Sequence, residues 1–182
     1  MPVQLGSQPE HGFDEPLGLL SDCHRRIERF LEMLKKVAEQ GGADAINDEG
    51  RRAVDAALEY FSTAAPRHTA DEEESLFPML RACDSSDARA AMKVVEALEH
   101  DHAAANLAHT EIHRLFSLWI DQRFLEPSLH RKLGSLLREL REMYRQHIAV
   151  EDRDLFPLAA RVLSPAQVAE LGRQMAQRRS VA

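Results

Sequence analysis

The chain has 182 residues, of which 44% are hydrophobic and 5% aromatic, and its formal net charge is -7 at pH 7. This length suits one domain with a single core. The acidic balance disfavours nucleic acid or an anionic membrane as a partner, because either would require a basic face. No apolar run is long enough for a membrane span and the N-terminus does not resemble a signal peptide, so we expect a cytoplasmic protein.

Helices are the only regular elements that the sequence predicts. Leu, Ala, Glu and Arg dominate, and neither alternating strand patterns nor hairpin turns occur, which indicates an all-α fold. Pro16 suits the first position of a first helix, and Gly41-Gly42 should end it. Pro66 should kink or restart the second helix. Caps and prolines place the helices at about 15–40, 47–80, 88–119 and 127–155, with a short fifth helix from 164.

These boundaries divide the chain into three parts. We expect an N-terminal arm over 1–14, a helical bundle over 15–160, and a short C-terminal helix and tail over 161–182. The two cysteines, Cys23 and Cys83, lack the spacing of a metal or redox motif, and we assign them no role.

An internal repeat carries most of the functional information. The segments 68–78 and 147–157 both have His at the first position, Glu four residues later, and Leu-Phe-Pro at the end. Upstream, His24 and His102 each have Leu four residues before them. His102 follows His24 by 78 residues and His147 follows His68 by 79, so both matches belong to one repeat. The chain is therefore interpreted as two fused helical hairpins.

The repeated residues predict a metal centre. Residues four apart share one face of a helix, so His68 with Glu72, and His147 with Glu151, can each bind one ion. His24 and His102 supply ligands from the other two helices, because facing helices of a bundle project side chains to a common centre. The predicted ligands are His24, His68, Glu72, His102, His147 and Glu151.

The donor set and the repeat indicate which ions bind. Four imidazoles and two carboxylates suit a divalent first-row metal such as iron, with zinc or manganese as alternatives, and fit calcium or magnesium badly. Two equivalent halves imply two ions, with Glu72 and Glu151 able to bridge them and an oxo, hydroxo or water bridge to complete the coordination. The alternative is a set of buried His and Glu side chains that satisfy one another without metal.

Other residues near these positions have two interpretations each. His100 competes with His102 for the ligand place on the third helix, and the repeat favours His102. Glu73 and Glu74 are most simply a solvated acidic face, although either could be an outer partner of a ligand. Tyr144 lies three residues before His147 and is either a core residue or a hydrogen-bond donor to a ligand of the metals.

The remaining aromatic and histidine residues belong mostly to the core or the helix surface. His109 and His113 are expected to be ordinary helix residues, with a channel lining as the alternative for His109. Leu and Phe of both Leu-Phe-Pro motifs should form an apolar wall that limits the access of water to the metals.

The motif resembles the hemerythrin-like domains, also called hemerythrin HHE cation-binding domains. The resemblance covers about 17–158 and rests on a lone His, a His-x3-Glu, a second lone His and a second His-x3-Glu, with Leu-Phe-Pro after each pair. The six predicted ligands fill these places in order. The resemblance implies an up-down-up-down four-helix bundle around a non-haem di-iron centre, with the C-terminal helix outside the motif.

The resemblance also bears on function. The oxygen-carrying hemerythrins have His-x3-His on the third helix and a closing Asp, whereas Glu151 takes that carboxylate place here. The pattern is closer to relatives associated with sensing oxygen, iron or nitric oxide, or with peroxide chemistry. We expect a di-iron protein that binds or senses dioxygen, nitric oxide or peroxide. The alternatives are a di-iron enzyme acting on peroxide or nitric oxide, and a partner-binding module with a structural metal; a protein partner or homo-oligomer stays open.

Overall fold

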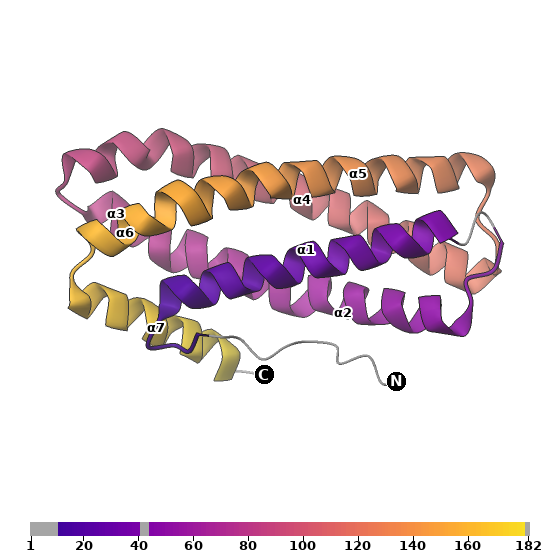
Figure 1. The fold of residues 1–182 in the computed structure, drawn as a ribbon, viewed down its shortest axis with the longest axis horizontal. Helices are drawn as coiled ribbons and strands as arrows, with labels where there is room; N and C mark the ends of the chain where they lie inside the picture. The colour runs from indigo at the N-terminus through magenta and orange to yellow at the C-terminus, as the bar shows by residue number, and fades with distance from the viewer. Residues whose placement is uncertain (1–10, 41–43, 181–182) are drawn as a thin grey trace.

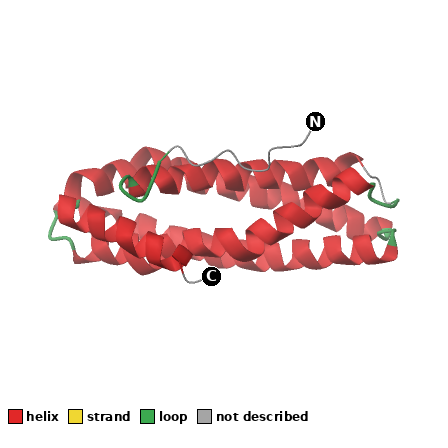
Figure 2. Ribbon diagram, turned by 90° about the horizontal axis from the view of Figure 1, so that it is seen from below, coloured by secondary structure: helices red, strands yellow, loops and turns green. Residues whose placement is uncertain are grey.

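The expected all-α fold is confirmed by a computed structural model, which describes residues 11–40 and 44–180. Four long helices lie side by side and alternate in direction (Figures 1 and 2), and in the described residues no strand is present. They are α1 (Pro16–Gln40), α2 (Asp48–Asp71), α4 (Ser86–Gln122) and α5 (Pro127–Val150). Helix α1 contacts α2 and α5, and α4 contacts the same two helices, so the four enclose one elongated core.

The helix starts follow the caps in the sequence. Asn47 accepts a hydrogen bond from the Gly50 amide at 2.7 Å, and Ser85 caps α4 through the Asp87 amide. A polar side chain at this position satisfies an amide that lacks a partner inside the helix. Helix α1 begins at Pro16 as expected, whereas Gly41-Gly42 lie outside the described residues. Pro66 lies within α2, which continues past it as one helix.

A π-helical turn follows both α2 and α5, and the sequence patterns did not predict it. These turns are η1 (Glu72–Leu76) and η2 (Glu151–Leu155), and they lead into α3 (Phe77–Ala82) and α6 (Phe156–Val162). The Phe77 amide bonds to the Glu72 carbonyl and the Phe156 amide to the Glu151 carbonyl, five residues back. In both places a proline comes next, and a proline ring clashes with the carbonyl four residues earlier in a regular helix.

Two apolar clusters fill the bundle, and the predicted ligands lie between them. Along α1, for example, His24 lies between Leu20 of one cluster and Ile27 of the other. The first cluster includes Ile27, Leu31, Leu34, Phe61, Phe116 and Trp119, and the second includes Leu20, Leu76, Phe77, Leu155, Phe156 and Leu171. Apolar side chains therefore exclude water from both ends of the site.

The C-terminal helix α7 (Pro165–Ser180) packs on the outside of α1 and α2 (Figure 1). Its apolar residues Leu171 and Met175 are fully buried against the second cluster. Gly172 allows a close approach of backbone, because a Cβ there would lie 1.8 Å from the Phe13 carbonyl oxygen. None of the helices in the described ranges is long and apolar enough to cross a membrane.

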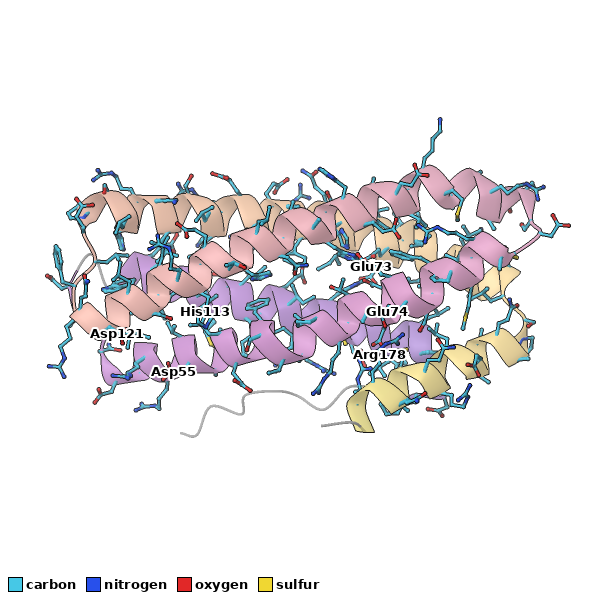
Figure 3. The ribbon with its side chains drawn as sticks, turned by 180° about the vertical axis from the view of Figure 1, so that it is seen from behind. Asp55, Glu73, Glu74, His113, Asp121 and Arg178 are labelled. Atoms are coloured by element: carbon cyan, nitrogen blue, oxygen red, sulfur yellow. The ribbon has the colours of Figure 1, made fainter. Side chains whose placement is uncertain are left out.

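Two arginines at the end of α7 neutralise a buried carboxylate beside the site. Arg178 and Arg179 contact the two oxygens of Asp71 at 2.9 and 2.7 Å, and the Asp71 side chain is fully buried. Arg178 also donates to the Ser75 hydroxyl at 2.6 Å and lies 3.4 Å from Glu74 (Figure 3). Helix α7 is thereby attached to the start of η1.

Replacing both arginines, Arg178→Ala with Arg179→Ala, should reduce the free energy of unfolding by about 3 kcal/mol, because an unpaired carboxylate would remain buried. Urea denaturation measures this loss. Arg173→Ala is the matched control, since Arg173 is exposed and, within the described residues, its ion pair is with Glu170 of the same helix. Adding Asp71→Asn to the double variant should restore part of the loss; equal losses in the control and the double variant would contradict this role.

Candidate metal centre

All six predicted ligands come together in the middle of the bundle. His24 comes from α1, His102 from α4, and the two His-x3-Glu pairs from the junctions of α2 with η1 and α5 with η2. The four imidazoles are at most 5% exposed, and both carboxylates are fully buried. The π turns begin at Glu72 and Glu151, so each widened turn starts at a carboxylate of the site.

The Nε2 atoms of the four imidazoles face the carboxylate oxygens and define two positions. At the first position, the Nε2 atoms of His24 and His68 lie 3.1 Å from Glu151 and 3.3 Å from Glu72, respectively. At the second position, His102 Nε2 lies 3.3 Å from Glu72 and His147 Nε2 lies 3.2 Å from Glu151. Each glutamate therefore contributes to both positions, as a bridging carboxylate would.

The geometry leaves the carboxylate oxygens of the site and the Nε2 atom of His24 without hydrogen-bond partners. All four oxygens of Glu72 and Glu151 are buried and accept no hydrogen bond. The Nε2 atoms of His102 and His147 lie 3.1 Å apart. A neutral imidazole carries one N–H, so when each ring donates it from Nδ1 to Glu73 or Asp101, neither Nε2 atom has a proton to share with the other. Buried acceptors without donors are costly, whereas a cation would satisfy all of them. The residues present therefore fit a metal ion.

The ligand atoms form two overlapping groups of a size that suits a metal. One group contains His24, His68 and Glu72, and the other contains His102, His147 and both glutamates; within each group, one ligand atom per residue lies within 4.8 Å of the others. Two adjacent groups that share Glu72 are the arrangement that two ions require.

Carboxylates outside the centre contact three of the four imidazoles. The Nδ1 atoms of His24 and His102 lie 3.0 Å from Asp152 and 2.8 Å from Glu73, and His147 Nδ1 lies 3.3 Å from Asp101. Such contacts are typical of metal-binding histidines, because they set the tautomer that directs a bare Nε2 at the metal. We refer to Asp152, Glu73 and Asp101 as the outer carboxylates.

The carboxylates of the centre raise the pKa of three of its imidazoles, whereas burial lowers the pKa of His68. Burial by itself lowers the pKa of His102, but the carboxylates of Glu72 and Glu73 that face the imidazole outweigh burial and raise the pKa to about 9. For His24, burial is again outweighed by the carboxylates that face it, and the pKa is raised well above its usual value. The buried carboxylates thus favour positive charge here, which metal ions supply with release of protons.

Phenylalanines of the two Leu-Phe-Pro motifs cover the imidazoles. Phe156 stacks on His24 with ring centroids 5.4 Å apart, and Phe77 stacks on His102 at 6.3 Å. Leu76 and Leu155 are buried with them. The expected apolar wall beside the site is confirmed.

The structure resolves two of the open interpretations. His102 is buried in the centre while His100 is exposed, as the repeat indicated. Glu73 is not simply part of a solvated acidic face: it contacts His102, because a residue next to Glu72 is turned about 100° around the helix, toward α4. Asp101 and Asp152 were missed, although each is adjacent in sequence to a predicted ligand.

Comparison with known proteins agrees with this geometry. The family model described as Hemerythrin HHE cation binding domain matches residues 15–159. The chain is also 29% identical over 174 residues to an uncharacterized protein of Haemophilus influenzae, a match that covers 93% of this chain and 92% of that protein. The family match spans both halves of the repeat and all six residues of the centre. The chain therefore belongs to the hemerythrin HHE cation-binding domain family.

Proposed function

We propose that this protein holds two iron ions on His24, His68, Glu72, His102, His147 and Glu151, and that the centre binds or senses dioxygen or a related small molecule. The observation that supports this most directly is the set of buried carboxylate oxygens that lack hydrogen-bond donors and face four Nε2 atoms. Mixed nitrogen and oxygen donors suit iron among the first-row metals. An iron pair supplies reversible redox chemistry and affinity for small oxygen or nitrogen ligands.

The protein's own residues would position and enclose these ions. The outer carboxylates orient three imidazoles, and the two glutamates join the positions. Phe77 and Phe156 exclude water on one side. A centre buried in this way is closed to large substrates, which supports a diatomic molecule or peroxide as the ligand.

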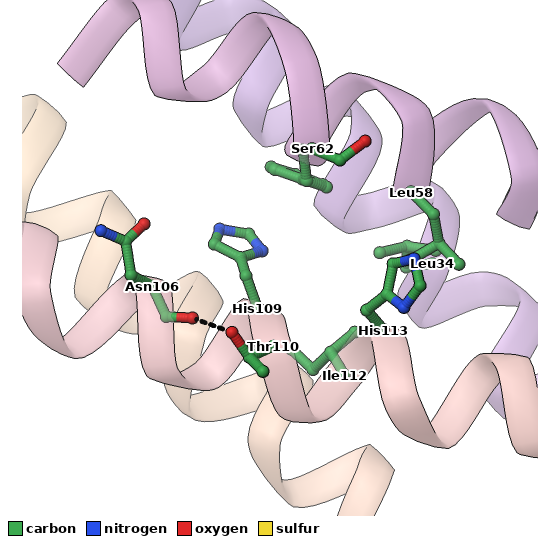
Figure 4. Close-up of a pocket in the computed structure, with 9 residues that line it drawn as sticks. Leu34, Leu58, Ser62, Asn106, His109, Thr110, Ile112 and His113 are labelled. Carbon is green, nitrogen blue, oxygen red and sulfur yellow. Dashed lines mark hydrogen bonds between the residues drawn. The ribbon is translucent and has the colours of Figure 1, made fainter. Parts of the chain in front are cut away.

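A cavity about two helical turns along the bundle from the predicted ligands supports an approach for such a ligand. It has a volume of about 380 Å³ and lies between α2 and α4, with Leu34 of α1 at its side (Figure 4). Its lining includes Phe61, Ser62, Asn106 and His109. The His109 side chain reaches from α4 into the space toward α2 (Figure 4).

His109 connects this cavity to the centre. Its ring stacks on Phe61 with centroids 4.3 Å apart, and its Nε2 lies 3.1 Å from the Tyr144 hydroxyl. The Tyr144 ring in turn packs against the ring of His147 at 6.2 Å. Burial lowers the pKa of His109 to about 4, so the imidazole is neutral at pH 7 and can accept the hydrogen bond of Tyr144. The hydrogen-bonded pair of His109 and Tyr144 thus lies between the cavity and the predicted ligands.

Metal analysis tests the proposed function. The purified protein, supplied with ferrous iron without oxygen, should bind about two ions per chain, and Glu72→Ala should bind less than about one, because Glu72 contributes to both positions. Binding should raise the midpoint of thermal unfolding of the unmodified chain, and it should raise that of Glu72→Ala much less. Mass spectrometry of metals and thermal denaturation are the measurements.

His100→Ala is the matched control, since His100 is exposed on the helix that carries His102. It should keep both ions. Iron content that is unchanged by Glu72→Ala, or a folded wild-type protein that binds no ferrous iron, would refute the proposed centre.

The buried His109 should make the metal-free protein sensitive to acid. The pKa of His109 in the fold, about 4, is below the usual value of about 6.5. Above about pH 6.5 the imidazole is neutral in both the folded and the unfolded chain, so it does not reduce the free energy of unfolding there. As the pH falls below that value the unfolded chain takes up a proton that the folded chain does not, and stability is lost down to about pH 4. Between pH 7 and pH 5 the wild type should lose about 2 kcal/mol more than His109→Gln.

Urea denaturation of both metal-free proteins at the two pH values measures this difference. Gln keeps an acceptor for the Tyr144 hydroxyl but does not titrate, so it isolates the proton on His109. Equal losses in the two proteins would contradict this prediction, because they would show that His109 takes up its proton as readily in the fold as in the unfolded chain.

A further inference from the structure

The two halves of the centre differ in one contact. At the second position both imidazoles have an outer carboxylate, Glu73 for His102 and Asp101 for His147. At the first position only His24 has one. The Nδ1 atom of His68 is buried and has no hydrogen-bond partner.

The internal repeat identifies the residue responsible for the difference. Glu73 and Asp152 are separated by 79 residues and both follow a glutamate of the centre, so they fill equivalent places. Asp101 directly precedes His102, and the equivalent residue before His24 is Cys23. Three of the four equivalent places therefore hold a carboxylate, and the fourth holds a thiol.

A thiol cannot replace the carboxylate in this role. Its sulfur is a weak hydrogen-bond acceptor, whereas a carboxylate accepts strongly and increases the basicity of the imidazole that it contacts. Cys23 is 5% exposed, so water does not readily substitute for the missing partner. The His68 ring is therefore the least constrained of the four and the least basic toward a metal.

The arrangement of ligand atoms independently distinguishes the two positions. His102 and His147 form a compact group with both glutamates, whereas His24 and His68 form one with Glu72 alone. The Nε2 atom of His24 lies 3.9 Å from Glu72 but 3.1 Å from Glu151, so this imidazole is directed toward the glutamate outside its own group. The second position thus brings all four of its donors within 4.8 Å of one another, whereas the first does so for three of its four.

We propose that the two metal positions are unequal: the position of His102 and His147 binds its ion first and more tightly, and the position of His24 and His68 fills second and empties first. This inference rests on the proposed two-metal function. The residue that makes the two positions unequal is Cys23, which occupies the place where the other half of the repeat has Asp101. Loss of one outer contact typically weakens metal binding about 10- to 100-fold, so the two dissociation constants should differ by about that factor.

Titration of the metal-free full-length protein with cobalt(II) tests this inference, with the visible spectrum and calorimetry as readouts. The wild type should show two binding steps whose dissociation constants differ by at least about 10-fold. His68→Ala should remove the weaker step and His147→Ala the tighter one. Two equal steps in the wild type would overturn the inference but leave the two-metal centre intact, whereas binding of no cobalt would contradict the centre itself.

Variants at the two equivalent places test the cause. Cys23→Asp should tighten the weaker step about 10-fold, and Asp101→Asn should weaken the tighter step by a similar factor. Cys23→Ala is the matched control and should leave both steps unchanged, because it removes the thiol without adding an acceptor. Asp101→Asn keeps the shape of a partly exposed side chain and tests the inference even if Cys23→Asp does not fold. Unchanged steps in Asp101→Asn would refute the role of the outer carboxylates.

Discussion

The burial of two carboxylates in the middle of a narrow helical bundle is the constraint on which the rest of the structure depends. Glu72 and Glu151 are fully enclosed and receive no hydrogen bond. An uncompensated charge in such a place costs several kcal/mol, so a source of positive charge must be built around it. Four converging imidazoles and the outer carboxylates meet this need as parts of one cation site.

Much of this arrangement follows from spacing in the sequence. The two His-x3-Glu motifs, with lone histidines at equivalent distances, were sufficient to predict the bundle and the convergence of six side chains. The π turns were not predicted, because one extra residue in a turn hardly disturbs the pattern of apolar residues along a helix. Only the prolines after Phe77 and Phe156 indicate these turns. Glu73 was interpreted as surface charge because its partner, His102, lies on another helix and no local pattern connects them.

Contacts between distant segments account for the other features that the sequence did not reveal. The position of α7 depends on Arg178 and Arg179 reaching Asp71, yet in the sequence these residues resemble ordinary surface charges. The pairing of His109 with Tyr144 likewise joins two helices. Periodicity predicts which side of a helix is buried. It does not predict which polar group of a neighbouring helix contacts that side.

The presence of a π turn in both halves has a consequence for the origin of the chain. Two hairpins that share motif, spacing and the same widened turn are what duplication and fusion of a gene for one hairpin produces. If both halves descend from one hairpin, the shared turn was already present in it, and two identical copies could have enclosed a symmetric centre as a homodimer. In a single chain, by contrast, each half can change independently of the other. Both Cys23 and the arginine pair on Asp71 occur on one side only, as such independent divergence permits.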